Sequence, residues 1–477
     1  MAMVDTRARV RRATLPRTVP GRLRRYTLGC VLLAVLAGAV GVTAASGARD
    51  SWDTIGDRQA PQVVDATGLY QALTDLDGQS ADVMLFGADP SFAAARSTAL
   101  AAFATDRTTA DRDLQQATVS AAGNASAQKA LGSVLDELGQ YQDLAGRALA
   151  LNDSARRPAG HPLPAALTLH RQATDLMRTE LLPAADQLVN ANNGAYEATY
   201  AEQRSALATA LLWSAALLVL LVVALVAVQA WLTLRFRRVV NPALAAATLI
   251  SLTLLGLTAS LFPDQREYQR VARHDAFDSV VALTRARALV SDANADESRY
   301  LLDADRAAVY QDSFLSTSQA VLALPGATIS TYDARLAAAV DAYRANHDDV
   351  LFQGFYGTEF HNITFAGERE AAERTLDAYQ AYQADDRRIR ADVARGELSQ
   401  AIAYDTSYAT GGSNADFGAH DAALRQVIGV NATAFHAAVH DGSAELDSDI
   451  PLLAGGAAAV VLLCLVGVRP RLAEFRR

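Results

Sequence analysis

Two histidines stand at the spacing of a helical metal site. His436 and His440, in the stretch HAAVH, are four residues apart and would share one face of a helix. Metalloproteases place a glutamate after the first histidine of such a pair and recruit a third ligand from elsewhere in the chain. Here the neighbour is alanine, and no third ligand is evident. We therefore interpret the pair as a polar helix face and predict neither a metal site nor a cofactor.

Other catalytic patterns are missing as well. The sequence has no Walker loop, dinucleotide-binding fingerprint, nucleophile elbow or protein-kinase motif. Its formal charge of −9 argues against nucleic-acid binding, which needs a basic face. We predict no catalytic residue and expect the chain not to be an enzyme.

The segment 351–365, LFQGFYGTEFHNITF, is dense in aromatic residues and glycine, although only 7% of the chain is aromatic. Exposed rings beside flexible glycines are typical of a protein contact. We predict a partner-binding surface outside the membrane, made of Phe352, Phe355, Tyr356, Phe360, His361 and Phe365. The alternative, left open, is that these rings pack into the core of a helical bundle.

Four segments that lack charged side chains predict an integral membrane protein. They are residues 26–46, 207–232, 243–262 and 450–468. About 20 residues at ~1.5 Å per residue are enough to cross ~30 Å of hydrocarbon. Gln229 is the one bulky polar residue in these spans, and transporters and channels usually need charges there. Transport is therefore disfavoured.

Arginines set the predicted orientation. Residues 1–25, 233–242 and 469–477 together hold 15 basic and two acidic residues, and they alternate correctly with four spans to lie in the cytoplasm. We predict a multi-pass protein of the bacterial plasma membrane with both termini inside. Segments 47–206 and 263–449 would then lie outside. The arginines that flank the last three spans are predicted to contact a cytoplasmic partner or anionic lipid: Arg235, Arg237, Arg238, Arg469 and Arg471.

The first span has an alternative interpretation as a cleaved signal peptide, since small residues in VTAAS follow the apolar run. An internal repeat favours a retained anchor. A shift of 216 residues superposes ALTDLDGQSADVMLFGAD, from Ala72, on ALVSDANADESRYLLDAD, from Ala288, and carries the first span onto the third. The motif VNPAL at Val240 recurs as VRPRL at Val468.

Both external segments are predicted to be helical bundles, which makes the fold all-α. In the first segment, apolar residues recur at the three- and four-residue spacing of a coiled-coil seam: Leu131, Val134, Leu138, Tyr141, Ala145 and Ala148. Glycine and proline gather in GADP, AAGNAS and RRPAGHPLP, which suits loops between antiparallel helices. The chain's two cysteines, Cys30 and Cys464, both fall in spans, so the external segments must be stable without disulfides.

The order span–bundle–span resembles the input half of bacterial chemoreceptors and sensor kinases, and DESRYLLDADRAAVYQDSF is similar to a helix–turn stretch of their sensory domains. A closer resemblance, over most of the chain, is to the GlnX-like family of actinobacterial four-span membrane proteins. It is carried by LYQALTDLDGQSADVMLFGADP, LHRQATDLMRTELLPAADQLV and VRPRLAEFRR. That resemblance implies a relay between an amino-acid-binding lipoprotein outside and a cytoplasmic Ser/Thr kinase inside.

We therefore expect a non-enzymatic signal relay whose partners are the lipid bilayer, a solute-binding lipoprotein and a Ser/Thr kinase. Two alternatives stay open. One is a direct small-molecule sensor with chemoreceptor-like bundles, and the other is a structural protein of the cell envelope. The sequence leaves open whether the chain forms a homo-oligomer.

Overall fold

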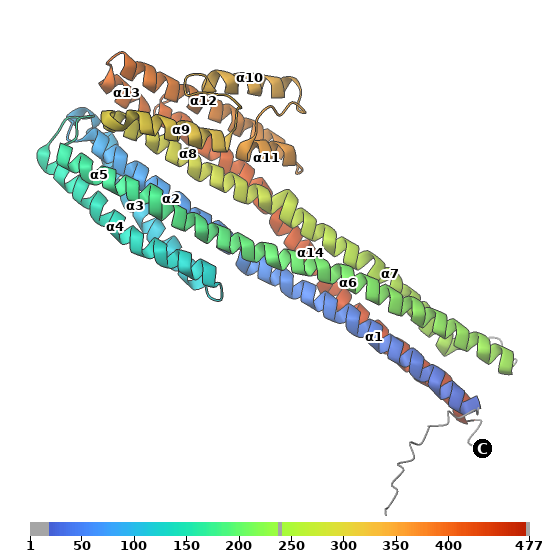
Figure 1. Cartoon of the computed structure of the whole chain (residues 1–477). Coiled ribbons are helices and arrows are strands. Elements are labelled where there is room, and N and C mark those ends of the chain that lie inside the picture. Colours follow the sequence, from blue (N-terminus) through green and yellow to red (C-terminus); the bar gives the residue numbers. More distant parts are fainter. Residues whose placement is uncertain (1–18, 237–240, 474–477) are drawn as a thin grey trace, which may run out of the picture. The chain divides into compact units, whose positions relative to one another are not determined.

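The computed structural model describes residues 19–236 and 241–473, and over these ranges the fold is all-helical (Figure 1). An isolated bridge between Ala323 and Gln353 is the sole β-type pairing in these ranges. The α-helices are α1 (Val19–Thr54), α2 (Ala60–Phe86), α3 (Ala93–Ser120), α4 (Ala125–Ala155), α5 (Pro164–Leu176), α6 (Leu182–Phe236), α7 (Pro242–Arg270), α8 (Asp278–Leu302), α9 (Ala307–Val321), α10 (Tyr332–Ala345), α11 (Gly354–Asn362), α12 (Glu368–Ala394), α13 (Leu398–Asp405) and α14 (Ser413–Ala473). The all-α prediction is confirmed for the described chain.

Short irregular helices interrupt or join these elements. Three are π-helical: η1 (Ile55–Gln59), η3 (Met177–Leu181) and η4 (Val271–Phe277). Two are 3₁₀ turns: η2 (Pro90–Phe92) and η5 (Ala304–Arg306). Pro183 has no N–H to donate to the carbonyl of Thr179, which lies in η3, so the regular ladder is broken at that point.

The chain divides into two compact units. Unit 1 comprises the described parts of Met1–Ser51, Glu202–Glu267 and Gly442–Arg477. Unit 2 comprises Trp52–Ala201 and Tyr268–Asp441. The two segments predicted as separate bundles therefore contribute to one compact unit.

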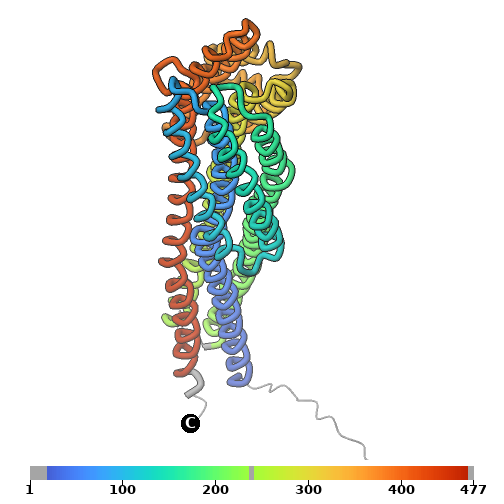
Figure 2. Tube along the Cα trace, turned by 90° about the vertical axis from the view of Figure 1, so that its left-hand side faces the viewer, coloured from blue at the N-terminus to red at the C-terminus, as the bar shows by residue number. Residues whose placement is uncertain are grey.

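Unit 1 contains four helical segments that lie side by side, from α1, α6, α7 and α14 (Figures 1 and 2). Each of these helices is long and apolar enough to cross a membrane, as predicted. Small residues allow the close packing. A Cβ added to Gly38 would lie 2.6 Å from the Cβ of Ala457, and one added to Gly456 would lie 2.7 Å from the side chain of Leu254. Such contacts are typical of membrane helices, which associate by packing instead of by hydrophobic burial.

Polar groups in unit 1 find partners on neighbouring helices. The Gln229 amide donates to the Thr248 hydroxyl at 2.9 Å and to the Leu244 carbonyl at 3.3 Å. The Asn241 amide donates to the Gly467 carbonyl at 2.7 Å. In a low-dielectric setting an unpaired amide is expensive, so these bonds fix how the spans pair.

Unit 2 is built around α2 and α8. Figure 1 shows α3, α4 and α5 on one flank of this pair and α9 to α13 on the other. A Cβ added to Gly78 on α2 would lie 3.2 Å from the Cβ of Ala295 on α8, so the two helices approach closely at this point. An offset of 216 residues separates Ser298 from Asp82, which it contacts. The tandem repeat with that shift stays a prediction.

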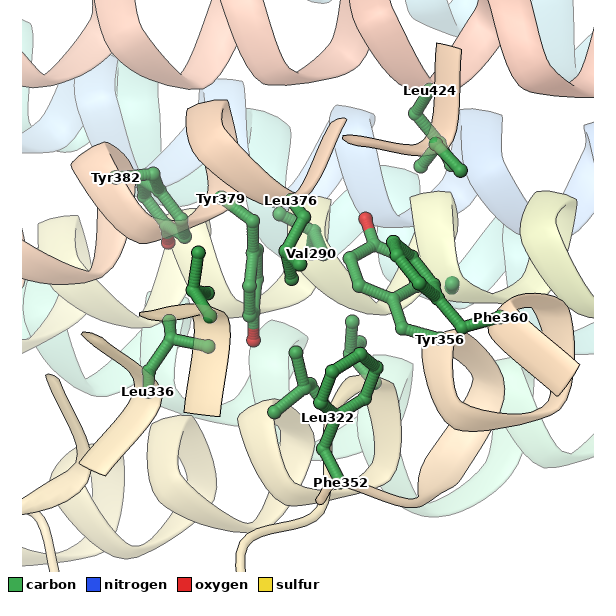
Figure 3. Packing of buried hydrophobic residues seen from close by; sticks show 14 of the residues in the cluster. Val290, Leu322, Leu336, Phe352, Tyr356, Phe360, Leu376, Tyr379, Tyr382 and Leu424 are labelled. Atoms are coloured by element: carbon green, nitrogen blue, oxygen red, sulfur yellow. The ribbon is translucent and has the colours of Figure 1, made fainter. Parts of the chain in front are cut away.

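Apolar and aromatic residues of α8 to α14 form a hydrophobic core in unit 2 (Figure 3). Val290 and Leu424 contribute from the long helices, and Tyr379 and Tyr382 contribute from α12. Tyr332 donates its hydroxyl to the Leu322 carbonyl at 2.7 Å, so this ring satisfies a polar group within the core. The core sets the register of α8, which carries the charged residues described next.

Candidate functional site: a buried charge network

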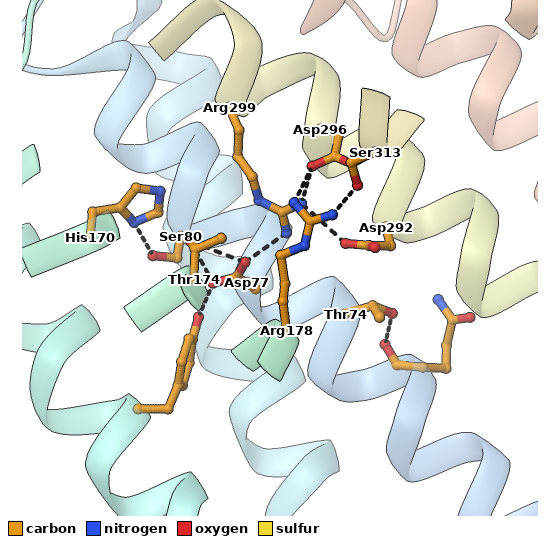
Figure 4. Close-up of polar contacts among 12 residues, drawn as sticks. Thr74, Asp77, Ser80, His170, Thr174, Arg178, Asp292, Asp296, Arg299 and Ser313 are labelled. Carbon is orange, nitrogen blue, oxygen red and sulfur yellow. Dashed lines mark hydrogen bonds and ion pairs between the residues drawn. The ribbon is translucent and has the colours of Figure 1, made fainter. Parts of the chain in front are cut away.

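A guanidinium is buried between α2 and α8. Arg299, on α8, is 1% exposed, and its Nη2 donates to Asp77 Oδ2 on α2 at 2.6 Å (Figure 4). Its Nη1 donates to Asp296 Oδ1 at 2.6 Å and to Asp292 Oδ1 at 3.1 Å. Positions 292, 296 and 299 lie on one face of α8 because they are separated by four and three residues. We call Arg299, its three carboxylates and Arg178 the charge network.

Helices on both flanks contribute to the charge network. Tyr141 on α4 donates its hydroxyl to Asp77 Oδ1 at 2.9 Å, and the hydroxyl of Thr174 on α5 lies 3.3 Å from Asp77 Oδ2 (Figure 4). Arg178 in η3 donates to Asp296 Oδ1 at 3.3 Å and to the hydroxyl of Ser313 on α9. A shift of any of these elements would therefore break a charge-assisted hydrogen bond.

The charge network is not fully balanced. Three carboxylates face two guanidiniums, and Asp296 Oδ2 and Arg299 Nε are buried without a hydrogen-bond partner. Burial raises the pKa of Asp296 to about 6, against the opposing effect of Arg299. Burial also raises the pKa of Tyr141 well above its usual value, so its hydroxyl stays protonated and donates to Asp77. Buried networks with unsatisfied members are costly, and strongly shifted pKa values cluster at functional sites.

Two further buried acids, Asp82 on α2 and Asp405 on α13, lie close to Ser298 on α8. Ser298 donates its hydroxyl to Asp82 Oδ1 at 2.5 Å and lies 3.3 Å from Asp405 Oδ2 on α13. The Ser298 hydroxyl has one proton, which it donates to Asp82. The contact with Asp405 is therefore most favourable when Asp405 is itself protonated. Burial raises the pKa of Asp405 well above its ordinary value, and the charge of Asp82 adds to the rise. Burial raises the pKa of Asp82 to about 6.

Residues 51–201 match the family model of the actinobacterial sensor domain. This range contributes Asp77 and Arg178 to the charge network, and it also contains Tyr141 and Thr174, which contact Asp77. The matched residues and the segment 268–441 therefore meet at these charges. The match supports a role in sensing or signalling, and it supports the interpretation of the chain as an actinobacterial sensor protein. No curated protein and no solved structure matches the chain.

The predicted aromatic surface needs correction. Phe352, Tyr356 and Phe360 are buried in the core of unit 2 (Figure 3). Tyr356 and Phe360 lie four residues apart on one face of α11, and Phe352 precedes the helix. Phe360 packs edge-to-face on Phe352 with ring centroids 5.2 Å apart. The core alternative therefore holds for these three rings, which cannot form an exposed contact.

The other members of that predicted surface lie nearer the solvent. Phe355 and Phe365 are half-buried, and His361 is largely exposed. Phe355 and His361 line a groove of about 740 Å³ together with His274 and Asp278. This groove is the part of the predicted surface that another protein can reach.

The predicted cytoplasmic arginines are described only in part. Arg235 and Arg469 are exposed at the ends of α6 and α14. Arg237 and Arg238 lie outside the described residues, and for Arg471 the structure gives helix α14 but no side-chain placement. The contact surface predicted from these five residues therefore stays a prediction.

The histidine pair stays a polar helix face. His436 and His440 are exposed on α14, and His440 lies against Asp441 at 3.2 Å. In the described ranges no group of three or more His, Cys, Asp or Glu residues is arranged to hold a metal ion.

Sequence reasoning missed the residues that matter most in unit 2. The charge network went unnoticed, and so did His420, whose Nε2 shares a hydrogen bond with the buried Tyr356 hydroxyl. Burial lowers the pKa of His420 to about 4, so this histidine is neutral at ordinary pH. The sequence did contain a signal for the charge network. The charged residues at 292, 296 and 299 fall on one face of a helix, and apolar residues precede and follow them in that helix.

Proposed function

We propose that this chain is a non-enzymatic transmembrane sensor. Unit 2 lies outside the plasma membrane and registers the stimulus, and the four spans of unit 1 carry the response to the cytoplasmic ends of the helices. The match of residues 51–201 to a sensor domain supports the sensing role, and four membrane-span-like helices support the membrane location.

The observation that carries the proposal is the charge network. A sensor needs an element with two arrangements that the stimulus can bias. Arg299 and Arg178 share Asp296, while one oxygen of Asp296 and one nitrogen of Arg299 remain unpaired. These unpaired atoms offer an alternative pairing for the same groups, and a change of pairing shifts α2 against α8.

The experiment removes the charges without leaving any of them unpaired. Arg299→Met alone should destabilise the protein by ~3–5 kcal/mol, because it strands buried carboxylates. Arg299→Met and Arg178→Met, combined with Asp77→Asn, Asp292→Asn and Asp296→Asn, remove all five charges of the network together and should restore most of that stability. This combined variant, which we call the charge-free variant, thus tests signalling in a folded protein.

The readout is the distance between two spin labels in unit 1. Leu234 on α6 and Leu465 on α14 are exposed, and they would be labelled in full-length protein in lipid nanodiscs after both native cysteines are replaced by serine. We expect the charge-free variant to shift the distance distribution. The control is Arg147→Met with Asp143→Asn, which removes an exposed ion pair of 3.1 Å in α4 and should leave the distribution unchanged. A folded charge-free variant with the native distribution would overturn the proposal.

A second candidate function is the relay that reads a solute-binding lipoprotein outside and informs a cytoplasmic Ser/Thr kinase pathway. The groove that contains Phe355 and His361 supports it, because a concave surface lined by two phenylalanines and two histidines suits a protein contact. Phe355→Asp should abolish co-purification of the lipoprotein from native membranes, while Val119→Asp, at an exposed position of α3 outside the groove, should not. Equal capture by both variants would remove this candidate.

A further inference from the structure

Unit 2 contains a second concave site, lined by residues that the charge network does not use. A cavity of about 330 Å³ lies between α2, α8 and the start of α14. The lining residues that matter for recognition are Gln79, Asp82, Asn294, Tyr408, Phe417 and Asp421. The volume lies at the lower end of the ~300–1,000 Å³ range of small-molecule pockets, so the cavity suits a small ligand.

The lining of the cavity is acidic. Two carboxylates line it, and its described lining residues include no lysine, arginine or histidine. Asp421 is already paired, with Arg287 on α8 and with Arg425 at 2.8 Å. The charge available to a ligand is therefore that of Asp82.

Asp82 is a buried carboxylate that forms no ion pair within residues 19–236 and 241–473. It is 7% exposed, and one of its oxygens accepts the Ser298 hydroxyl. Its other oxygen accepts no hydrogen bond from the described residues, although the side chain lines the cavity. A charged carboxylate in such a setting is strongly stabilised by a cation that enters the cavity.

The remaining walls suit an organic cation. Tyr408 is 64% exposed, and its ring lines the cavity together with that of Phe417. Aromatic faces attract ammonium groups, and they do so more strongly than they attract uncharged groups of the same shape. Asn294 Oδ1 is buried without a partner and can accept from a ligand N–H.

The loop that carries Tyr408 is held in place before any ligand arrives. The Ala415 N–H donates to the Ser407 carbonyl at 3.1 Å, and the Gly412 N–H donates to the Ala409 carbonyl at 2.9 Å. A Cβ at Gly412 would lie 2.5 Å from the Cβ of Ser407, so only glycine fits at this turn. A preorganised wall reduces the entropy lost on binding.

We propose that this cavity binds a small alkylammonium ligand, with its cationic head between Asp82 and the rings of Tyr408 and Phe417. The inference deepens the proposed function, on which it rests, by naming a chemical class for the stimulus. A ligand that also carries a carboxylate is disfavoured, because the described lining offers no cation to receive it. A metal ion is disfavoured as well, because the described residues hold no group of three or more suitable ligands.

The test uses choline as the probe and 3,3-dimethyl-1-butanol as its uncharged isostere. Binding would be measured by isothermal titration calorimetry on the full-length chain in nanodiscs. Choline should bind, and the isostere should bind at least ~10-fold more weakly, because the charge supplies the recognition. Asp82→Asn keeps a hydrogen-bonding group next to Ser298 and should weaken choline binding by ~30-fold or more. Asp136→Asn, an exposed acid on α4, should leave binding unchanged.

The ring contribution has its own pair of variants. Tyr408→Phe keeps the aromatic face and should bind choline like the native chain, whereas Tyr408→Ala should bind it at least ~5-fold more weakly. Because this ring is exposed, neither variant should disturb folding. Absence of choline binding, equal affinity for the isostere, or full binding by Asp82→Asn would each overturn the proposal. None of these results bears on the spin-label distances, so failure of the cavity and failure of the sensor proposal are distinguishable.

Discussion

Glu359 shows what burial does to a single carboxyl group in unit 2. It lies on α11 at 1% exposure, and its Oε1 accepts from the Asn431 amide of α14 at 3.4 Å. The same amide donates to Glu368 at 2.7 Å, so two carboxyl groups share one donor. Burial raises the pKa of Glu359 to about 8, and the charge of Glu368 adds to the rise, while a hydrogen bond with Ser279 opposes it. At neutral pH Glu359 therefore keeps its proton in the folded state.

The raised pKa of Glu359 makes the free energy of unfolding depend on pH, and the direction can be predicted. The unfolded chain loses the proton near pH 4.5 and the folded chain loses it near pH 8, so the stabilising contribution is present below pH 4.5 and is lost as pH rises to 8. Relative to Glu359→Gln, the native chain should lose as much as ~4 kcal/mol across that window. Thermal melting followed by circular dichroism in detergent micelles at pH 5 and pH 8 would measure the difference. Glu370→Gln, an exposed change on α12, is the control, and parallel pH profiles for native chain and Glu359→Gln would contradict the prediction.

Helix ends position the charged side chains of unit 2. Helix α2 ends at Phe86, and Gly87 follows with a φ of +54°, where a Cβ would lie 2.4 Å from the Arg157 carbonyl oxygen. The Ala88 N–H donates to that carbonyl at 2.8 Å, and the Gly160 N–H donates to the Leu85 carbonyl at 2.8 Å. The end of α2 is thus bonded to the loop between α4 and α5, and this fixes the height of Asp77 and Asp82 beside α8.

Two glycines in residues 51–201 should therefore respond in opposite ways to substitution by alanine. Gly139 is exposed within α4 with no heavy atom within 4 Å of its added Cβ, so Gly139→Ala should stabilise the protein by ~0.5–1 kcal/mol. Gly87→Ala should destabilise it by ~1–3 kcal/mol, because the left-handed conformation and the carbonyl contact are both incompatible with a side chain. Melting temperatures of the two variants would check this, and a shift in the same direction for both would refute it.

The sequence predicts elements better than it predicts the charges between them. The seam of α4 is confirmed, since Leu131, Val134, Leu138, Tyr141, Ala145 and Ala148 are all buried. Apolar periodicity is a local signal, so it is readable without the fold. Asp77 and Arg299 are 222 residues apart, and nothing local marks either as buried, because an aspartate or arginine is usually exposed. Composition likewise suggested an exposed contact in 351–365, although Tyr356 and Phe360 have the four-residue spacing of one helix face.

Orientation in the membrane is a property of the whole molecule. The described spans have exposed arginines at Arg235 and Arg469, and the predicted cytoplasmic tail of residues 1–25 is strongly basic. Basic segments next to spans remain on the cytoplasmic side. Both halves of unit 2 should then face outside.

Single cysteines would test this orientation in a background in which Cys30 and Cys464 are serine. Cysteines at Ser133 and Ala342 should react with a membrane-impermeant maleimide added to intact cells, and a cysteine at Thr6 should react only after the membrane is opened. Labelling of Thr6 alone in intact cells would place unit 2 in the cytoplasm and invert the proposed direction of signalling.

The partnership of Asp77 and Arg299 also governs how the protein is made. Their 222-residue separation means that α2 leaves the ribosome long before α8 exists. At ~5–20 residues per second, the wait is roughly 10–40 s, during which the acids of α2 have no guanidinium to meet. The acidic face of α2 that is later buried then stays hydrated, and α2 cannot yet pack against α8. Completion of unit 2 is therefore a late event in synthesis, and a ribosome that stalls before Arg299 leaves α2 without the cation that Asp77 binds.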